Sequence, residues 1–290
     1  MVLLIHPKIP NNFTGTTISA EAAKIWVFGV PFDSTTSYRT GTRKGPDAIR
    51  EASQQTELYD INTGIDVDSD IGFYDLGDME IAAGRSEETL ERVSDNIENI
   101  LKHGKMPLML GGEHSITAGA IMGAARFFGD IKLISFDAHA DLRDEYEGNR
   151  YNHACVMRRI TDIIGRENLL EVGIRSATRE EAESFRDRIV FRHECRDMEE
   201  TKKKILEFAK DANLYVSFDI DALDVAGTGT PQPDGLSYAE MHEFVSQLDA
   251  AKKIIGMDLV EVSPVPGNNF TEALAAKLLF QTCAILRKKI

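Results

Sequence analysis

Short apolar runs alternate along the chain with longer stretches in which apolar residues recur with a helical period. The runs are nearly continuous and rich in β-branched residues, which is typical of strands that are buried on both faces of a sheet. We therefore predict strands at residues 25–30, 107–110, 131–136, 169–174, 214–218 and 254–260.

Helices are predicted between these strands. In residues 87–103 the apolar positions, among them Leu90, Val93 and Ile97, are three or four residues apart and line one helix face. Further helices are predicted at 115–128, 153–164, 201–210, 238–250 and 271–287. The alternation of strands and helices predicts an α/β fold, with a mostly parallel sheet covered by helices on both faces. Because no repeat or linker interrupts the pattern, we expect one domain over residues 1–290.

Polar residues with metal-binding side chains follow four of the predicted strands. In a parallel α/β sheet, ligands bind outside the carboxyl ends of the strands. If the sheet is parallel, these side chains therefore converge at one edge. They are His114 after the second predicted strand, Asp137, His139 and Asp141 after the third, Asp219 and Asp221 after the fifth, and Glu261 after the sixth.

The spacing and types of these residues indicate a site for two metal ions. Asp137, His139 and Asp141 alternate, so an extended segment directs all three to one side. Carboxylates gathered so closely would repel one another and would be costly to desolvate without cations. Six ligands, including His114, suit two ions that share bridging carboxylates. Imidazole and carboxylate ligands without thiolate favour Mn²⁺, with Zn²⁺, Co²⁺ and Fe²⁺ as alternatives.

Composition excludes some classes of function. The 290 residues include 47 Asp and Glu against 33 Lys and Arg, a formal net charge of −14. This acidity argues against binding to nucleic acid or to a membrane surface, because either would require a basic face. Three cysteines at unrelated spacings indicate a reducing compartment, and the first ten residues lack the basic start of a signal peptide. We therefore expect a cytoplasmic protein.

With these motifs the sequence resembles the ureohydrolase family, the arginase and agmatinase group, from about residue 25 to residue 283. The resemblance rests on Gly29-Val30-Pro31-Phe32-Asp33, on Gly45-Pro46-Asp47-Ala48-Ile49-Arg50, and on the strand-end segments 111–115, 137–141, 217–224 and 261–264. It implies a three-layer α/β/α fold and two Mn²⁺ ions per chain. It also implies hydrolysis of a guanidino group to urea and an amine.

The resemblance further implies a role for each candidate residue. One ion would be held by His114, Asp137, Asp141 and Asp219, and the other by Asp137, His139, Asp219 and Asp221, with Asp137 and Asp219 bridging. Asp141 would also aim the attacking hydroxide, Glu261 would pair with the substrate cation, and Thr230 would lie near the guanidino group. His153 matches a flexible-loop histidine that contacts the substrate and protonates the leaving amine. The alternative for His153 is a solvent-facing loop residue.

Two departures from the family pattern bear on the substrate. The segment after Asp224 is shorter than usual and lacks the family's proline. This departure bears on whether Thr230 takes the family position near the guanidino group, more than it bears on the metal ligands. Residues 142–151 lack the Asn-, Thr- and Ser-rich pattern with which arginases bind the α-amino and α-carboxylate groups. We therefore expect an agmatinase, a homo-oligomer (trimer or hexamer) that converts agmatine to putrescine and urea in polyamine biosynthesis. Aminopropylagmatine, guanidinobutyrate and arginine remain alternative substrates, and a two-metal phosphoesterase or a non-catalytic metal-binding protein remain alternative functions.

Overall fold

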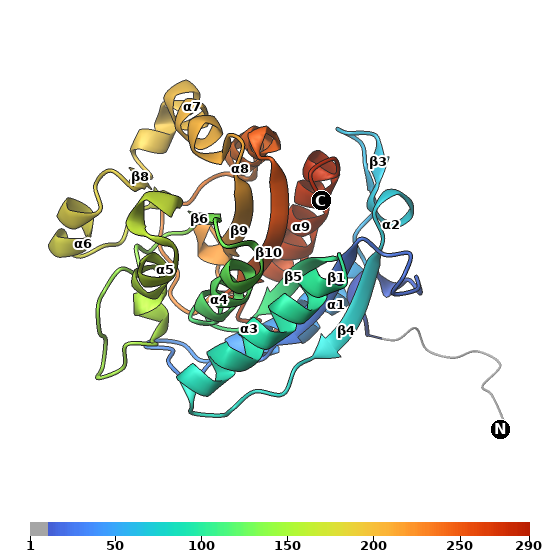
Figure 1. Ribbon diagram of the computed structural model, residues 1–290, viewed down its shortest axis with the longest axis horizontal. Helices are drawn as coiled ribbons and strands as arrows, with labels where there is room; N and C mark the ends of the chain where they lie inside the picture. The colour runs from blue at the N-terminus through green and yellow to red at the C-terminus, as the bar shows by residue number, and fades with distance from the viewer. Residues whose placement is uncertain (1–10) are drawn as a thin grey trace.

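The computed structural model describes residues 11–290, so the expectation that the first ten residues are not a signal peptide lies outside the described range. An eight-stranded sheet, with strand order β4-β1-β5-β10-β9-β6-β7-β8, passes through its centre, and all neighbouring strands are parallel (Figure 1). Its strands are β1 (Ile25–Val30), β4 (Phe73–Asp78), β5 (Met106–Gly111), β6 (Lys132–Phe136), β7 (Leu169–Ile174), β8 (Ile189–Phe191), β9 (Asn213–Asp219) and β10 (Lys253–Val260). A separate antiparallel pair consists of β2 (Tyr59–Asp60) and β3 (Ile65–Asp66).

Helices cover both faces of the sheet and complete three layers. One face packs against α3 (Ser86–Lys102), α4 (Ile116–Phe128) and α5 (Val156–Ile164). The other packs against α1 (Gly45–Ser53), α7 (Met198–Ala209), α8 (Tyr238–Ser246) and α9 (Phe270–Leu286). Two short helices, α2 (Val67–Asp70) and α6 (Arg179–Ser184), lie in the connections. The predicted α/β/α fold is confirmed.

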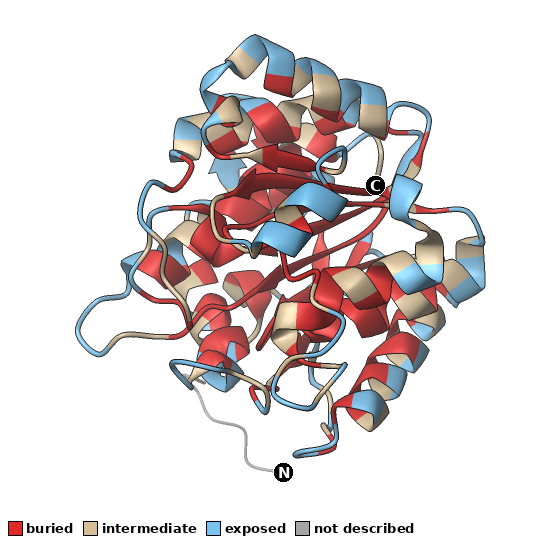
Figure 2. Cartoon of the chain, turned by 90° about the vertical axis from the view of Figure 1, so that its left-hand side faces the viewer, coloured by how far each residue is buried: buried red, intermediate tan, exposed pale blue. Residues whose placement is uncertain are grey.

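The two faces of the sheet explain why the strands read as continuous apolar runs. In β9, Val216 and Phe218 join the core beneath α8 and α9, whereas Tyr215 joins the core beneath α3 and α4. Figure 2 shows the strands as a buried layer between helices whose outer faces are exposed. Each large apolar side chain buried in this way contributes roughly 1.5–3 kcal/mol to stability, so both helix layers hold the sheet in place.

The six predicted strands are present, but two edge strands were not predicted. β4 and β8 lie at the two ends of the strand order. β4 contains three acidic or glycine positions and is only partly buried, and β8 has three residues. An edge strand needs no continuous apolar run, because one of its sides has no neighbouring strand to pair with. Helix α1 was also missed, since its sequence begins with Gly-Pro-Asp.

The strand order brings the polar strand ends together. β5, β10, β9 and β6 are consecutive neighbours in the middle of the sheet. Because they are parallel, their carboxyl ends share one edge, and these are the four strands that precede the candidate residues. Among residues 11–290, no helix is both long and apolar enough to span a membrane. The three cysteines are buried as free thiols.

Candidate metal centre

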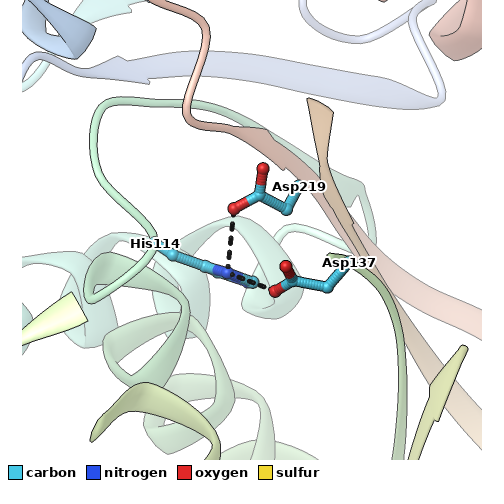
Figure 3. A group of neighbouring side chains, drawn as sticks. All are labelled: His114, Asp137 and Asp219. Atoms are coloured by element: carbon cyan, nitrogen blue, oxygen red, sulfur yellow. Dashed lines mark ion pairs between the residues drawn. The ribbon is translucent and has the colours of Figure 1, made fainter. Parts of the chain in front are cut away.

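Two groups of potential metal ligands lie at this edge of the sheet. In the first, His114 Nδ1 lies 3.0 Å from Asp137 Oδ2 and 3.3 Å from Asp219 Oδ2 (Figure 3). In the second, His139 Nδ1 lies 3.0 Å from Asp221 Oδ2 and 3.8 Å from Asp137 Oδ1. Asp137 thus directs one carboxylate oxygen to each group, which is the placement that a bridging ligand requires.

The other two candidate ligands, Asp141 and Asp219, do not lie between the two groups as Asp137 does. Asp141 Oδ2 lies 3.6 Å from His114 Nδ1, at the margin of the first group. Asp219 belongs to the first group, and its Oδ1 accepts a hydrogen bond of 2.9 Å from the backbone N–H of Asp221. The structure therefore places all six candidate ligands at one edge of the sheet, with Asp137 in both groups and Asp219 in one.

Several ligand atoms are buried without a hydrogen-bond partner. Among the described residues, His114 Nδ1, Asp137 Oδ2 and Asp221 Oδ2 make no hydrogen bond, although each faces an oppositely charged or polar neighbour. An unsatisfied buried polar atom costs about 1–3 kcal/mol. Divalent cations would satisfy all three atoms at once, and the set of two imidazoles and four carboxylates fits two such ions.

The electrostatics of the cluster lead to the same conclusion. Burial and repulsion from neighbouring carboxylates raise the pKa of Asp219 well above its usual value, and burial and Asp137 raise the pKa of Asp141 to about 8. Burial alone would lower the pKa of His114, but pairing with Asp137 and Asp219 raises it well above the usual value. Without a cation, these raised pKa values favour protonated carboxylates and a protonated imidazole. A bound cation has the opposite effect, because it stabilises ionised carboxylates and neutral imidazoles as ligands.

A buried hydrogen-bond chain orients His114. Ser217 on β9 donates to Asp258 Oδ1 of β10 at 2.6 Å, so its oxygen accepts from His114 Nε2–H at 3.1 Å. Thr117 donates to the other oxygen of Asp258 at 3.0 Å. This arrangement leaves the lone pair of His114 Nδ1 facing the carboxylates, as metal binding requires. The sequence predicts no role for Ser217 or Asp258, although each is a polar residue between apolar neighbours in a buried strand.

A cavity of about 260 Å³ opens onto the cluster. Its wall includes His139, Asp141, His153, Asp219, Thr230 and Glu261, together with Gln232, which was not predicted. Glu261 follows β10 directly, is 5% exposed, and accepts a hydrogen bond of 2.7 Å from the backbone N–H of His114. Burial raises the pKa of Glu261 to about 8, so a cationic partner would favour its ionised form.

His153 lies at the start of a 3₁₀ turn, His153–Cys155, that runs into α5. Its Nδ1 lies 2.7 Å from the carbonyl oxygen of Thr35, and its Nε2 lies 3.2 Å from Ser37 Oγ. Burial lowers the pKa of His153 to about 4, which favours a neutral ring. The ring therefore lines the cavity without belonging to either ligand group.

Comparison with known proteins agrees with this arrangement. The family model described as "Arginase family" matches residues 23–284. The chain belongs to the arginase family. It is 38% identical over 276 residues to the N(1)-aminopropylagmatine ureohydrolase of Thermococcus kodakarensis (93% of each chain). It is 36% identical over 248 residues to the agmatinase of Halalkalibacterium halodurans (84% of this chain, 85% of the other).

Solved structures show the same fold. The agmatine ureohydrolase of Thermoplasma volcanium superimposes with a TM-score of 0.86 at 38% identity, over 99% of this chain and 96% of the other. The expected resemblance to the arginase and agmatinase group and the expected fold class are therefore confirmed.

The backbone is not extended at Asp141 or at Asp221, although the alternating spacing of the candidate ligands predicts extended segments there. Asp141 has a left-handed backbone, with φ of 48°. Asp221 lies in a 3₁₀ turn, Ile220–Ala222, because the Asp219 side chain accepts a hydrogen bond from its backbone N–H. Such a side-chain-to-backbone bond favours a turn over an extended strand. Both carboxylates still reach the cluster.

Proposed function

We propose that this arginase-family protein hydrolyses agmatine to putrescine and urea, using two Mn²⁺ ions. The observation that carries the proposal is the convergence of two ligand groups, Glu261 and His153 on one cavity of about 260 Å³. Relatives called agmatinase and N(1)-aminopropylagmatine ureohydrolase support a guanidino substrate. The same family membership argues against a phosphoesterase and against a purely binding role.

The proposed ligands are the two groups in the structure, extended by the roles that the family resemblance implies for Asp141 in the first site and for Asp219 in the second. His114, Asp137, Asp141 and Asp219 would hold one ion, and Asp137, His139, Asp219 and Asp221 the other. Oxygen and imidazole ligands of this kind suit Mn²⁺. When bound, the ions lower the pKa of water and so supply a nucleophile at neutral pH.

The other residues of the cavity bind the substrate and move protons. The Glu261 carboxylate pairs with the guanidinium, and Thr230 belongs to the same cavity wall. Asp141 accepts a hydrogen bond from the attacking water and orients it. The amine must leave protonated, so His153 Nε2 takes up the proton that the attacking water releases and passes it to the nitrogen of the leaving amine.

Replacement of His153 by alanine tests the proton-transfer step. The variant is expected to keep both ions and its KM for agmatine, while kcat falls roughly 10²–10⁴-fold, the usual range for the loss of a general acid. Steady-state kinetics and metal analysis measure both effects, and added imidazole should restore part of the rate. His103→Ala, an exposed histidine just before β5, is the matched control and should behave as wild type. A His153→Ala variant with the wild-type kcat would exclude this role.

A longer guanidino polyamine is the second candidate substrate. A neighbouring cavity of about 400 Å³ shares Arg143, Thr178 and Glu181 with the first cavity, so it offers room for an aminopropyl extension. One relative is an N(1)-aminopropylagmatine ureohydrolase. Side-by-side values of kcat/KM for agmatine, aminopropylagmatine, guanidinobutyrate and arginine will rank the substrates. The proposal expects agmatine to be first, and a higher kcat/KM for aminopropylagmatine would assign the second candidate instead.

We also propose that residues 1–290 form one ureohydrolase domain that acts in the cytoplasm as a trimer or hexamer. The central eight-stranded sheet, which takes strands from both ends of the described chain, supports one domain. The net charge of −14 argues against nucleic acid and membrane surfaces as partners, which leaves a small cationic guanidino substrate and further copies of the chain. Light scattering of the purified protein measures the oligomeric state.

A further inference from the structure

The loop after β1 holds His153 through Thr35. The backbone N–H of His153 donates to Thr35 Oγ1 at 2.9 Å, and His153 Nδ1 lies 2.7 Å from the Thr35 carbonyl oxygen. Asn152 Nδ2 also donates to that carbonyl oxygen, at 3.3 Å. Thr35 thus contacts both the backbone and the ring of the proposed proton donor, although the two residues are 118 positions apart.

These contacts determine the tautomer of the ring. A carbonyl oxygen only accepts hydrogen bonds, so His153 Nδ1 must carry the proton that it donates to Thr35. In the neutral ring, Nε2 then carries a lone pair, which accepts a hydrogen bond from the Ser37 hydroxyl at 3.2 Å. Both side chains line the cavity. The lone pair is therefore placed where it can take up a proton and pass it to the leaving amine.

Glu113 holds Thr35 in turn. Its Oε2 accepts from the Thr35 backbone N–H at 2.7 Å, and its Oε1 accepts from the hydroxyls of Thr35 at 2.5 Å and Ser115 at 2.6 Å. Because the Thr35 hydroxyl donates to Glu113, its oxygen accepts from His153 N–H. Glu113 is fully buried, so its position is fixed by packing as well as by these bonds.

The backbone near Glu113 holds the two loops in close contact. A Cβ atom on Gly112 would lie 1.9 Å from the carbonyl oxygen of Phe32, so only glycine fits. The Glu113 N–H also donates to that oxygen at 2.8 Å. The Gly-Gly-Glu-His motif therefore does more than carry His114, because its glutamate connects the loop after β1 to His153.

We propose that Thr35, anchored by Glu113, is a positioning residue that fixes the orientation and tautomer of His153 for proton transfer. The inference rests on the proposed function, since it assumes that His153 protonates the leaving amine. Without the Thr35 hydroxyl, the turn that carries His153 loses its link to Glu113, and the ring can rotate away from the amine. A misplaced group of this kind slows chemistry more than it weakens binding.

Thr35→Val, which keeps the carbonyl group and removes the hydroxyl, tests this link. We expect kcat to fall roughly 10- to 100-fold, with the KM for agmatine and the content of Mn²⁺ unchanged. Thr35→Ser retains the hydroxyl and should recover most of the rate. Thr36→Val makes the same change at the next residue, whose hydroxyl donates to the carbonyl oxygen of Asp33, and should behave as wild type.

A double-mutant cycle with His153→Ala decides whether Thr35 acts through His153. If it does, Thr35→Val/His153→Ala is no slower than His153→Ala alone, because the positioned group is already gone. The inference is overturned if Thr35→Val has the wild-type kcat, or if it slows the His153→Ala background by the same factor as the wild type. A wild-type rate for His153→Ala would instead refute the proposed proton donor, and the inference with it.

Discussion

Replacing Asp137 by alanine is expected to release both metal ions and to abolish nearly all activity. Asp137 is the ligand that lies in both groups, with Oδ2 toward His114 and Oδ1 toward His139. Its removal therefore takes one ligand from each ion. Because metal ions supply several kcal/mol of transition-state stabilisation, the rate should fall by about three orders of magnitude or more.

Metal analysis of the purified variants, alongside urea release, measures both effects. The family resemblance assigns a bridging role to Asp219 as well, so Asp219→Ala is expected to give the same double loss, whereas His139→Ala should chiefly weaken one site. Asp130→Ala is the matched control, because Asp130 is an exposed aspartate just before the opposite end of β6. An Asp137→Ala protein that retained two ions per chain would contradict the bridging assignment.

Glu261→Gln is expected to separate substrate binding from metal binding. Glutamine keeps the shape of the side chain and an oxygen for the His114 N–H, but it removes the charge that pairs with the guanidinium. Loss of one partner from a buried charge pair costs about 2–5 kcal/mol, so kcat/KM should fall by roughly 30- to 5,000-fold. The content of Mn²⁺ should not change, since Glu261 is in neither ligand group.

Steady-state kinetics on agmatine and metal analysis measure the two quantities on the same preparation. Glu272→Gln makes the same change at a buried glutamate in α9, outside the cavity wall, and should leave kcat/KM unaltered. Unchanged kinetics in Glu261→Gln would mean that this side chain only accepts the hydrogen bond from the His114 backbone N–H and does not bind the substrate.

The central strands and the metal-binding residues could be predicted because the same physical constraint governs both. Strands in the middle of a parallel sheet are buried on two faces, so they read as apolar runs. The point at which each run ends in polar residues is then easily located, as at Asp137 after β6 and at Asp219, the last residue of β9. The edge strands β4 and β8 carry no such constraint and were missed.

The supporting residues could not be predicted, because they depend on tertiary contacts. Ser217 and Asp258 meet across two neighbouring strands, and Thr35 meets Glu113 across 78 positions of sequence. Nothing local to Thr35 indicates that its hydroxyl connects a buried glutamate to His153. Similarly, the turn at Asp221 follows from a bond to the Asp219 side chain, which the alternating spacing does not indicate.

Urea release from agmatine by metal-stripped protein, titrated with Mn²⁺, tests the central claim most directly. The proposed function predicts no urea without metal and a rate that rises to a plateau at two Mn²⁺ ions per chain, in the wild type but not in Asp137→Ala. The contradictory result is a protein that binds two Mn²⁺ ions per chain and releases no urea from agmatine or from any other guanidino compound.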